Sequence, residues 1–179
     1  MNKGDGKFDP KKFADTAFEH LKRENLTPLA EYARTVRPFL AERGLENPSE
    51  ALLLRAVPTI RERARTLKEA ANALDFYFRE PPELDEKARD KLLGQGEAAR
   101  LAEPGEGHAE LDDWRAEPLE AAARGFCEAH GIAMKDIAQA ARVAVTGRSA
   151  SPPLFEVMAV LGKERSLARL ARAPELARK

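Results

Sequence analysis

Two arginines in the C-terminal third of the sequence lie on the predicted outer faces of helices, and a third follows them in a loop. Arg124 comes five residues after Leu119, the first apolar residue of its helix, and so lies about 140° around that helix. Arg142 has the same spacing from Ile137 in the next helix, and Arg148 follows that helix. Guanidinium groups bind base edges through paired hydrogen bonds and stack on base faces, so these residues are candidates for contact with nucleic acid. The alternative for each is a solvated or salt-bridged surface arginine.

The loop that contains the third arginine also contains two adjacent prolines (GRSASPPLFEVM, residues 147–158). Ser151 is the predicted N-cap of the next helix, whereas Pro152 and Pro153 have no N–H group, so the loop is a poor phosphate site. Pro152, Pro153 and Leu154 instead form an expected apolar ledge that suits the faces of unstacked bases. Alternatively, Leu154 begins an apolar helix stripe and packs in the core, which the periodicity favours.

No residue pattern in the chain predicts catalysis or metal binding. Cys127 is the one cysteine, which excludes an internal disulfide, and its place beside an apolar stripe predicts a buried thiol. The three histidines, His20, His108 and His130, are scattered rather than paired at metal-ligand spacing. A glycine-rich phosphate loop is missing too. We therefore expect no catalytic residue, no metal site and no cofactor in this chain.

The composition is typical of a helical protein rich in surface charge. Of 179 residues, 34 % are charged and 6 % aromatic, with 30 Lys+Arg balancing 30 Asp+Glu. Residues 1–79 and 120–179 are net basic, whereas residues 80–119 are net acidic, so a nucleic-acid partner is expected to contact the two basic parts. Plain solvation is the alternative explanation of this charge. Without a long apolar run or a signal-peptide pattern, we expect a cytoplasmic location.

The elements that must position these residues are predicted to be helices throughout. A polar residue followed by proline marks four helix starts: Asp9-Pro10, Thr27-Pro28, Asn47-Pro48 and Ser151-Pro152. Alternating β-branched segments are missing, so the expected fold class is all-α. The periodicity predicts helices at residues 10–24, 28–43, 48–64, 66–78, 85–101, 117–130, 134–146, 152–161 and 163–173.

Helix ends and the linker also follow from glycine and proline. Helix C-termini are expected at Gly44, Gly131, Gly147 and Gly162. Pro38 and Pro58 fall inside helical patterns and are expected to kink or divide them. Residues 102–113 (AEPGEGHAELDD) combine proline, glycine and acid, and predict a linker between helical subdomains at 1–101 and 114–179.

The segment RVAVTGRSASPPLFEVMAVLGKERSLARLARA (142–173) closely resembles the C-terminal anticodon-binding region of bacterial glutamyl-tRNA synthetases, which are class I aminoacyl-tRNA synthetases. Four further segments occur in the family's order and spacing: VRPFLAERGL (36–45), Arg63 through TLKE (66–69), FYFREPPELDEKA (76–88) and RGFCEAHGI (124–132). The resemblance covers nearly the whole chain and is strongest at 120–173. It departs from the family at Pro152-Pro153, where Pro-Gly is common, and at residues 11–21, which lack the usual Trp-Asn stretch.

This resemblance implies an all-α cage of two helical subdomains that holds the anticodon loop of glutamate tRNA. Arg63 corresponds to the arginine that distinguishes the third anticodon base of glutamate tRNA from that of glutamine tRNA, and relaxed family members often carry glutamine there. The remaining matched positions would surround the flipped anticodon bases: Arg124, Arg142, Ser151, Pro152 and Leu154, with Arg148 as a candidate contact to the RNA backbone.

The catalytic motifs of the family, His-Ile-Gly-His and Lys-Met-Ser-Lys-Ser, are missing from the sequence. We therefore expect that this chain does not aminoacylate tRNA alone and that ATP and Mg²⁺ belong to the parent catalytic domain. We expect the chain to be a monomer. Its expected partners are glutamate tRNA and, if the chain is a fragment, the synthetase catalytic domain. The alternative is a freestanding helical adaptor that kept the fold and binds a protein; steep salt dependence of binding would favour RNA.

Overall fold

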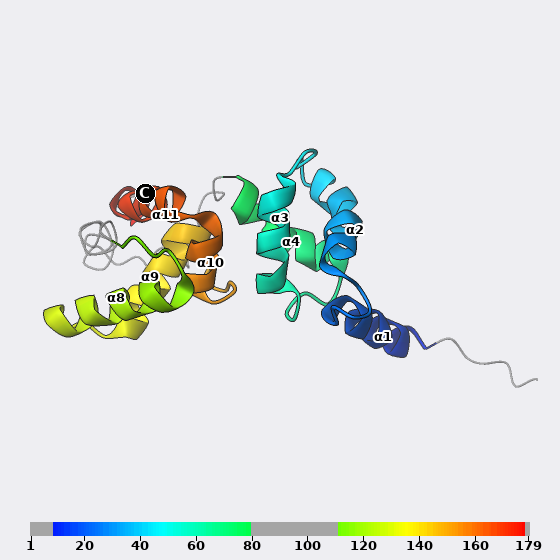
Figure 1. The fold of residues 1–179 in the computed structure, drawn as a ribbon, viewed down its shortest axis with the longest axis horizontal. Helices are drawn as coiled ribbons and strands as arrows, with labels where there is room; N and C mark the ends of the chain where they lie inside the picture. Colours follow the sequence, from blue (N-terminus) through cyan, green and yellow to red (C-terminus); the bar gives the residue numbers. More distant parts are fainter. Residues whose placement is uncertain (1–8, 80–110, 178–179) are drawn as a thin grey trace, which may run out of the picture. The chain divides into compact units, whose positions relative to one another are not determined.

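The computed structural model describes residues 9–79 and 111–177, and every regular element in these two segments is an α-helix (Figure 1). This described part of the chain contains nine helices: α1 (Pro10–Lys22), α2 (Leu29–Ala41), α3 (Glu50–Ile60), α4 (Leu67–Phe78), α8 (Ala116–His130), α9 (Met134–Thr146), α10 (Leu154–Leu161), α11 (Lys163–Ala171) and α12 (Ala173–Ala177). The all-α prediction is confirmed. The predicted helix at 85–101 lies outside the described residues.

The chain forms two compact units, residues 1–75 and 76–179. The division falls inside α4, between Asp75 and Phe76. The predicted linker at 102–113 lies largely outside the described residues, so the subdomain boundaries given for it stay a prediction.

The core of the first unit lies between α2, α3 and α4, each of which presents one apolar stripe. Its fully buried side chains include Tyr32, Val36, Leu40, Leu53, Val57, Ile60 and Leu74. Burying an aliphatic side chain of this size contributes about 1.5–3 kcal/mol relative to leaving it exposed. Helix α1 contributes no buried residue to this core.

The core of the second unit lies between α8, α9, α10 and α11. Alanines on the inner face of α9, such as Ala140 and Ala144, are buried and let the neighbouring helices approach closely. Trp114 precedes α8 and donates a hydrogen bond from Nε1 to the carbonyl of Met158 at 2.9 Å. This bond ties the segment before α8 to α10.

Helix α1 begins as predicted, but three other helix starts are wrong. Asp9 caps α1 by accepting hydrogen bonds from the backbone N–H groups of Lys11 and Lys12. The other N-caps lie one or two residues beyond the expected ones: Pro28 instead of Thr27, Ser49 instead of Asn47, and Pro153 instead of Ser151. Two of the expected caps have other partners, because the Thr27 hydroxyl donates to the His20 carbonyl and the Ser151 hydroxyl accepts from Arg142.

The predicted breaks at glycine and proline have different outcomes. All four glycines, Gly44, Gly131, Gly147 and Gly162, have positive φ, as expected at helix C-termini. By contrast, neither proline divides its helix: α2 continues past Pro38, and α3 continues past Pro58. Both prolines are exposed, so water can bond the carbonyl that each leaves without a backbone donor.

Candidate nucleic-acid interface

Arg142 is held against the loop that follows its own helix. Its Nη1 lies 2.7 Å from Ser151 Oγ, 3.2 Å from the Ser151 carbonyl oxygen and 2.8 Å from the Pro152 carbonyl oxygen. Its Nε donates to Gln139 Oε1 at 3.2 Å. The side chain is half-buried, which corrects the expectation that Arg142 faces outward: the loop oxygens turn the guanidinium back along the protein surface.

The same loop is braced at its start by Thr146. The buried Thr146 hydroxyl donates to the Arg142 carbonyl at 2.7 Å and accepts from the Arg148 backbone N–H at 3.2 Å. Gly147 follows with a φ of 72°, a backbone conformation that residues with a Cβ rarely adopt. The loop geometry is therefore set by Arg142 at one end and by Thr146 and Gly147 at the other.

The predicted apolar ledge is not formed. Pro152 and Leu154 are buried, and Pro153 alone of the three is exposed. Leu154 begins the apolar stripe of α10 and lines an apolar pocket with Ala123 and Ile137, so the core alternative describes it correctly. Pro152 and Leu154 thus support the loop from the interior of the unit. Their contact with RNA stays a prediction.

Two further predicted residues lie on the surface of the second unit. Arg124 is exposed on α8, as expected, and its Nη2 donates to Glu120 Oε1 at 2.8 Å. Such an exposed pair contributes about 0.3–0.5 kcal/mol, so a phosphate or base can replace Glu120 at little cost. Arg148 is half-buried, with its guanidinium carbon 5.9 Å from the centre of the Phe76 ring.

Arg63 belongs to the first unit and lies in the turn directly after α3. Its backbone N–H donates to the Ile60 carbonyl at 2.9 Å, and its side chain is exposed. No hydrogen bond or ion pair joins its guanidinium to another described residue. It is therefore available to an external ligand.

The sequence interpretation missed two buried arginines. Arg61 is 6 % exposed and Arg169 is 3 % exposed. Each lies one helical turn from a buried apolar residue: Arg61 comes four residues after Val57, and Arg169 comes four residues before Ala173. A charged residue at such a position was the available signal, because a buried guanidinium must be hydrogen-bonded.

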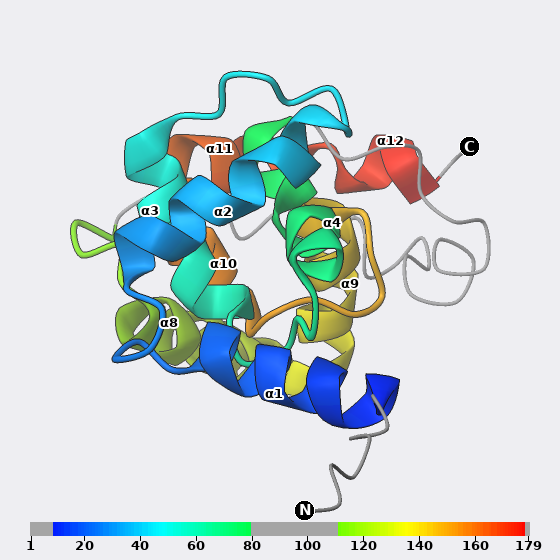
Figure 2. The ribbon, with the colours of Figure 1, turned by 90° about the vertical axis from the view of Figure 1, so that its right-hand side faces the viewer.

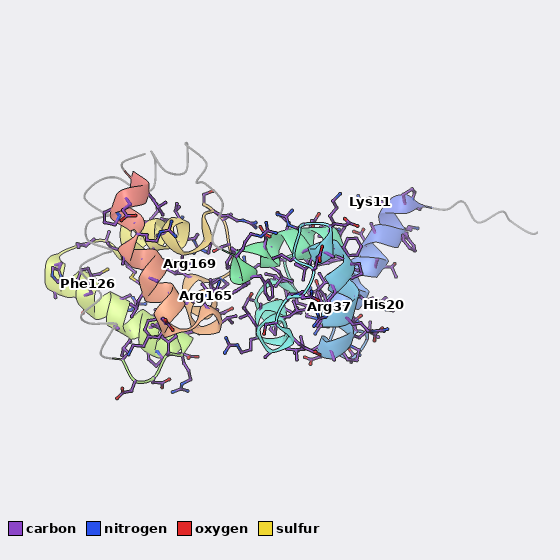
Figure 3. All side chains as sticks on the ribbon, turned by 90° about the horizontal axis from the view of Figure 1, so that it is seen from above. Lys11, His20, Arg37, Phe126, Arg165 and Arg169 are labelled. Atoms are coloured by element: carbon purple, nitrogen blue, oxygen red, sulfur yellow. The ribbon has the colours of Figure 1, made fainter. Side chains whose placement is uncertain are left out.

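Arg169 binds three backbone carbonyls in the second unit. Its Nη1 donates to Val145 at 2.7 Å, and its Nη2 donates to Phe76 and to Arg79, each at 2.8 Å. Arg165, one turn earlier on α11, donates to the Tyr77 carbonyl at 2.7 Å (Figure 3). The C-terminal end of α4 is thus bound by two cations, which complement the partial negative charge of a helix C-terminus.

Two buried side chains among the described residues have a raised pKa. Burial raises the pKa of the Cys127 thiol, whose sulfur lies 3.7 Å from that of Met134. Burial also raises the pKa of Tyr32 to about 12, although the charge of Arg61 opposes this. Among the described residues, no three His, Cys, Asp or Glu side chains gather to hold a metal ion, and no helix is long and apolar enough to cross a membrane.

A family model described as "anticodon binding domain" matches residues 31–174. The chain belongs to this family. The match includes every residue predicted for the site, Arg63 as well as the segment from Arg124 to Leu154.

Curated relatives of this anticodon-binding domain are glutamate–tRNA ligases. Glutamate–tRNA ligase 2 of Rhizorhabdus wittichii is 36 % identical over 171 residues, which cover 95 % of this chain and 36 % of that protein. Glutamate–tRNA ligase of Thermus thermophilus is 42 % identical over 145 residues, covering 81 % and 31 %. The chain therefore spans about a third of the length of these relatives and is homologous to their anticodon-binding region.

A solved structure has the same helical arrangement. The crystal structure of a glutamate tRNA ligase from Elizabethkingia meningosepticum, in complex with its amino acid, matches with a TM-score of 0.81 and 26 % identity. The match covers 94 % of this chain and 32 % of that one.

Proposed function

We propose that this chain binds the anticodon loop of glutamate tRNA as the recognition domain of a glutamate–tRNA ligase. The observation that carries the proposal is the match to the anticodon-binding family over residues 31–174. The relatives are glutamate–tRNA ligases, which indicates that the tRNA is the one for glutamate. The arginines of the described surface supply the chemistry that base recognition needs.

The role of each arginine in this proposal follows from its burial. Arg63 and Arg124 are exposed and contact bases or backbone directly, whereas Arg142 holds the Ser151–Pro152 loop that lies beside the bound RNA. Arg148 carries positive charge to the RNA backbone. A good bidentate pair between a guanidinium and a base discriminates by about 1–3 kcal/mol. Arg63 makes this a domain that distinguishes glutamate tRNA from glutamine tRNA.

Catalysis belongs to another domain in this proposal. A nucleotide-binding domain would bind ATP and Mg²⁺ and attach glutamate, while the present chain selects the tRNA. Only tRNA contacts are assigned to its residues, and no step of the reaction is assigned to them. Mixing the purified chain with ATP, glutamate and glutamate tRNA is expected to give no aminoacylation unless a catalytic domain is added.

Binding to two tRNAs tests the proposal. We would measure the Kd of the chain for glutamate tRNA and for the same tRNA with a changed anticodon, at two salt concentrations. We expect tighter binding to the unchanged tRNA, weakening as salt rises, because phosphate contacts release counterions. Arg124→Gln should weaken binding, whereas Arg34→Gln, at a similarly exposed arginine paired within its own helix, should not.

Equal binding to both tRNAs would exclude base recognition by this chain. Absent binding, or binding that does not respond to salt, would favour the protein adaptor.

A further inference from the structure

The turn that presents Arg63 is attached to α1 on both sides. Arg61 and Arg65 flank Arg63 in the sequence, and each binds a residue of α1 (Pro10–Lys22). Figure 2 shows α1 running past the point where α3 ends. The turn is therefore held to the same helix before and after Arg63.

Arg61 forms the buried half of this attachment. Its Nε donates to the carbonyl of Leu21 at 2.9 Å, and its Nη2 donates to the carbonyl of Thr27. Its guanidinium carbon lies 5.3 Å from the centre of the Tyr32 ring, a cation–π contact in the first unit's core. With 6 % exposure, Arg61 is fixed in place by α1, by the loop after α1 and by α2.

Arg65 forms the exposed half. Its Nη2 donates to Asp15 Oδ1 at 2.5 Å, and its guanidinium carbon lies 5.1 Å from the centre of the Phe18 ring. Its backbone N–H donates to Glu69 Oε2 at 2.8 Å, which ties the other end of the turn to α4.

Between these arginines, the turn itself is closed by the carbonyl of Ile60, which accepts from the N–H groups of Arg63 and Ala64. Ala64 is buried, whereas Glu62 and Arg63 are exposed, and the side chain of neither is bonded to another described residue. Helix α1 has no buried residue of its own, and Arg61 and Arg65 both bind it from this turn.

We propose that Arg61 and Arg65 are positioning residues for Arg63, and that they hold its turn in place by binding to α1. This role rests on the proposed function, in which Arg63 reads the anticodon. A guanidinium that reads a base edge must be held within about half an ångström of the productive geometry. A loose turn would be ordered only on binding, at a cost in affinity for the matching tRNA. The attachment of the turn to α1 through Arg61 and Arg65 therefore sets discrimination at the third anticodon base without contacting RNA.

Charge-conserving variants test this role. Arg61→Lys and Arg65→Lys keep the positive charge, so general attraction to RNA is unchanged, but they lose the planar donor geometry. The measured quantity is the ratio of Kd values for glutamate tRNA and for the same tRNA carrying the third anticodon base of glutamine tRNA. We expect each variant to reduce this discrimination by about fivefold or more, approaching Arg63→Ala. Arg34→Lys, on α2, is the matched control and should keep it.

A double-mutant cycle separates positioning from general structure. In the Arg63→Ala background, adding Arg65→Lys should change discrimination no further, because the residue acts through Arg63. Amide hydrogen exchange supplies a readout without RNA: the amides of Arg63 and Ala64 should exchange about tenfold faster in Arg65→Lys than in the parent chain. Arg65 is exposed, so its variant remains informative if Arg61→Lys does not fold.

The outcomes distinguish the two proposals. If the parent chain binds and discriminates, but the lysine variants keep full discrimination or add to Arg63→Ala, the positioning role is overturned. Full discrimination by Arg63→Ala also overturns it and leaves anticodon binding intact. A parent chain that binds neither tRNA overturns the proposed function and, with it, the positioning role.

Discussion

At the scale of single residues, burial separates two kinds of arginine in this chain. Arg63 and Arg124 are exposed and suited to contact a ligand, whereas Arg61 and Arg169 are buried and bind backbone carbonyls. Arg142 is half-buried and binds loop oxygens. Helical periodicity places Arg124 correctly but misplaces Arg142, because a long side chain can fold back from its helix face toward acceptors that only the folded loop supplies.

Removing the guanidinium of Arg142 should therefore destabilise the protein more than removing that of Arg124. Arg142→Ala leaves the Ser151 carbonyl without its donor and removes one of the two donors to the Pro152 carbonyl, and we expect a loss of about 1–3 kcal/mol in the free energy of unfolding. Arg124→Ala breaks only an exposed pair with Glu120 and should cost less than about 0.5 kcal/mol.

Urea denaturation of both variants measures the difference. Equal stabilities would mean that Arg142 does not hold the loop, and its effect on tRNA binding would then be a direct contact.

At the scale of the elements, the sequence predicts the helices well and their first residues poorly. The all-α fold and the glycine-terminated helix ends follow from local signals, namely apolar periodicity and the positive φ of glycine. The starts at Thr27 and Ser151 depend on partners distant in the sequence, because their hydroxyls bind His20 and Arg142. The prediction of an apolar ledge is wrong for the same reason, because Leu154 packs against residues of α8 and α9 that are distant in the sequence.

Arg169 connects three elements, and its loss should affect all of them. Arg169→Met keeps the volume near that of the aliphatic stem but leaves the buried carbonyls of Val145 and Phe76 without a donor. We expect the free energy of unfolding to fall by about 3 kcal/mol.

Thermal and urea unfolding would measure this change, with Arg34→Met as the exposed control. A loss no larger than the control's would contradict the role of Arg169 in joining α11, α9 and the end of α4.

At the scale of the whole molecule, the described residues of the candidate site come from both units. Arg63 lies in the first unit, and Arg124, Arg142 and the loop after it lie in the second. Only the family resemblance predicts a common ligand for them, because residues so far apart along the chain share no periodicity or spacing.

Helix α4 belongs to both units, and this limits how related proteins could exchange them. A chimera that joins the first unit of one relative to the second unit of another must be spliced within a helix, between Asp75 and Phe76. One extra residue at that junction rotates everything after it by about 100°. Inserting an alanine there should put Phe76 and Tyr77 out of phase with Leu74 and, because all three side chains are buried, lower the melting temperature. Recombination at this point is thus restricted to relatives whose α4 helices have the same number of residues on each side of the junction.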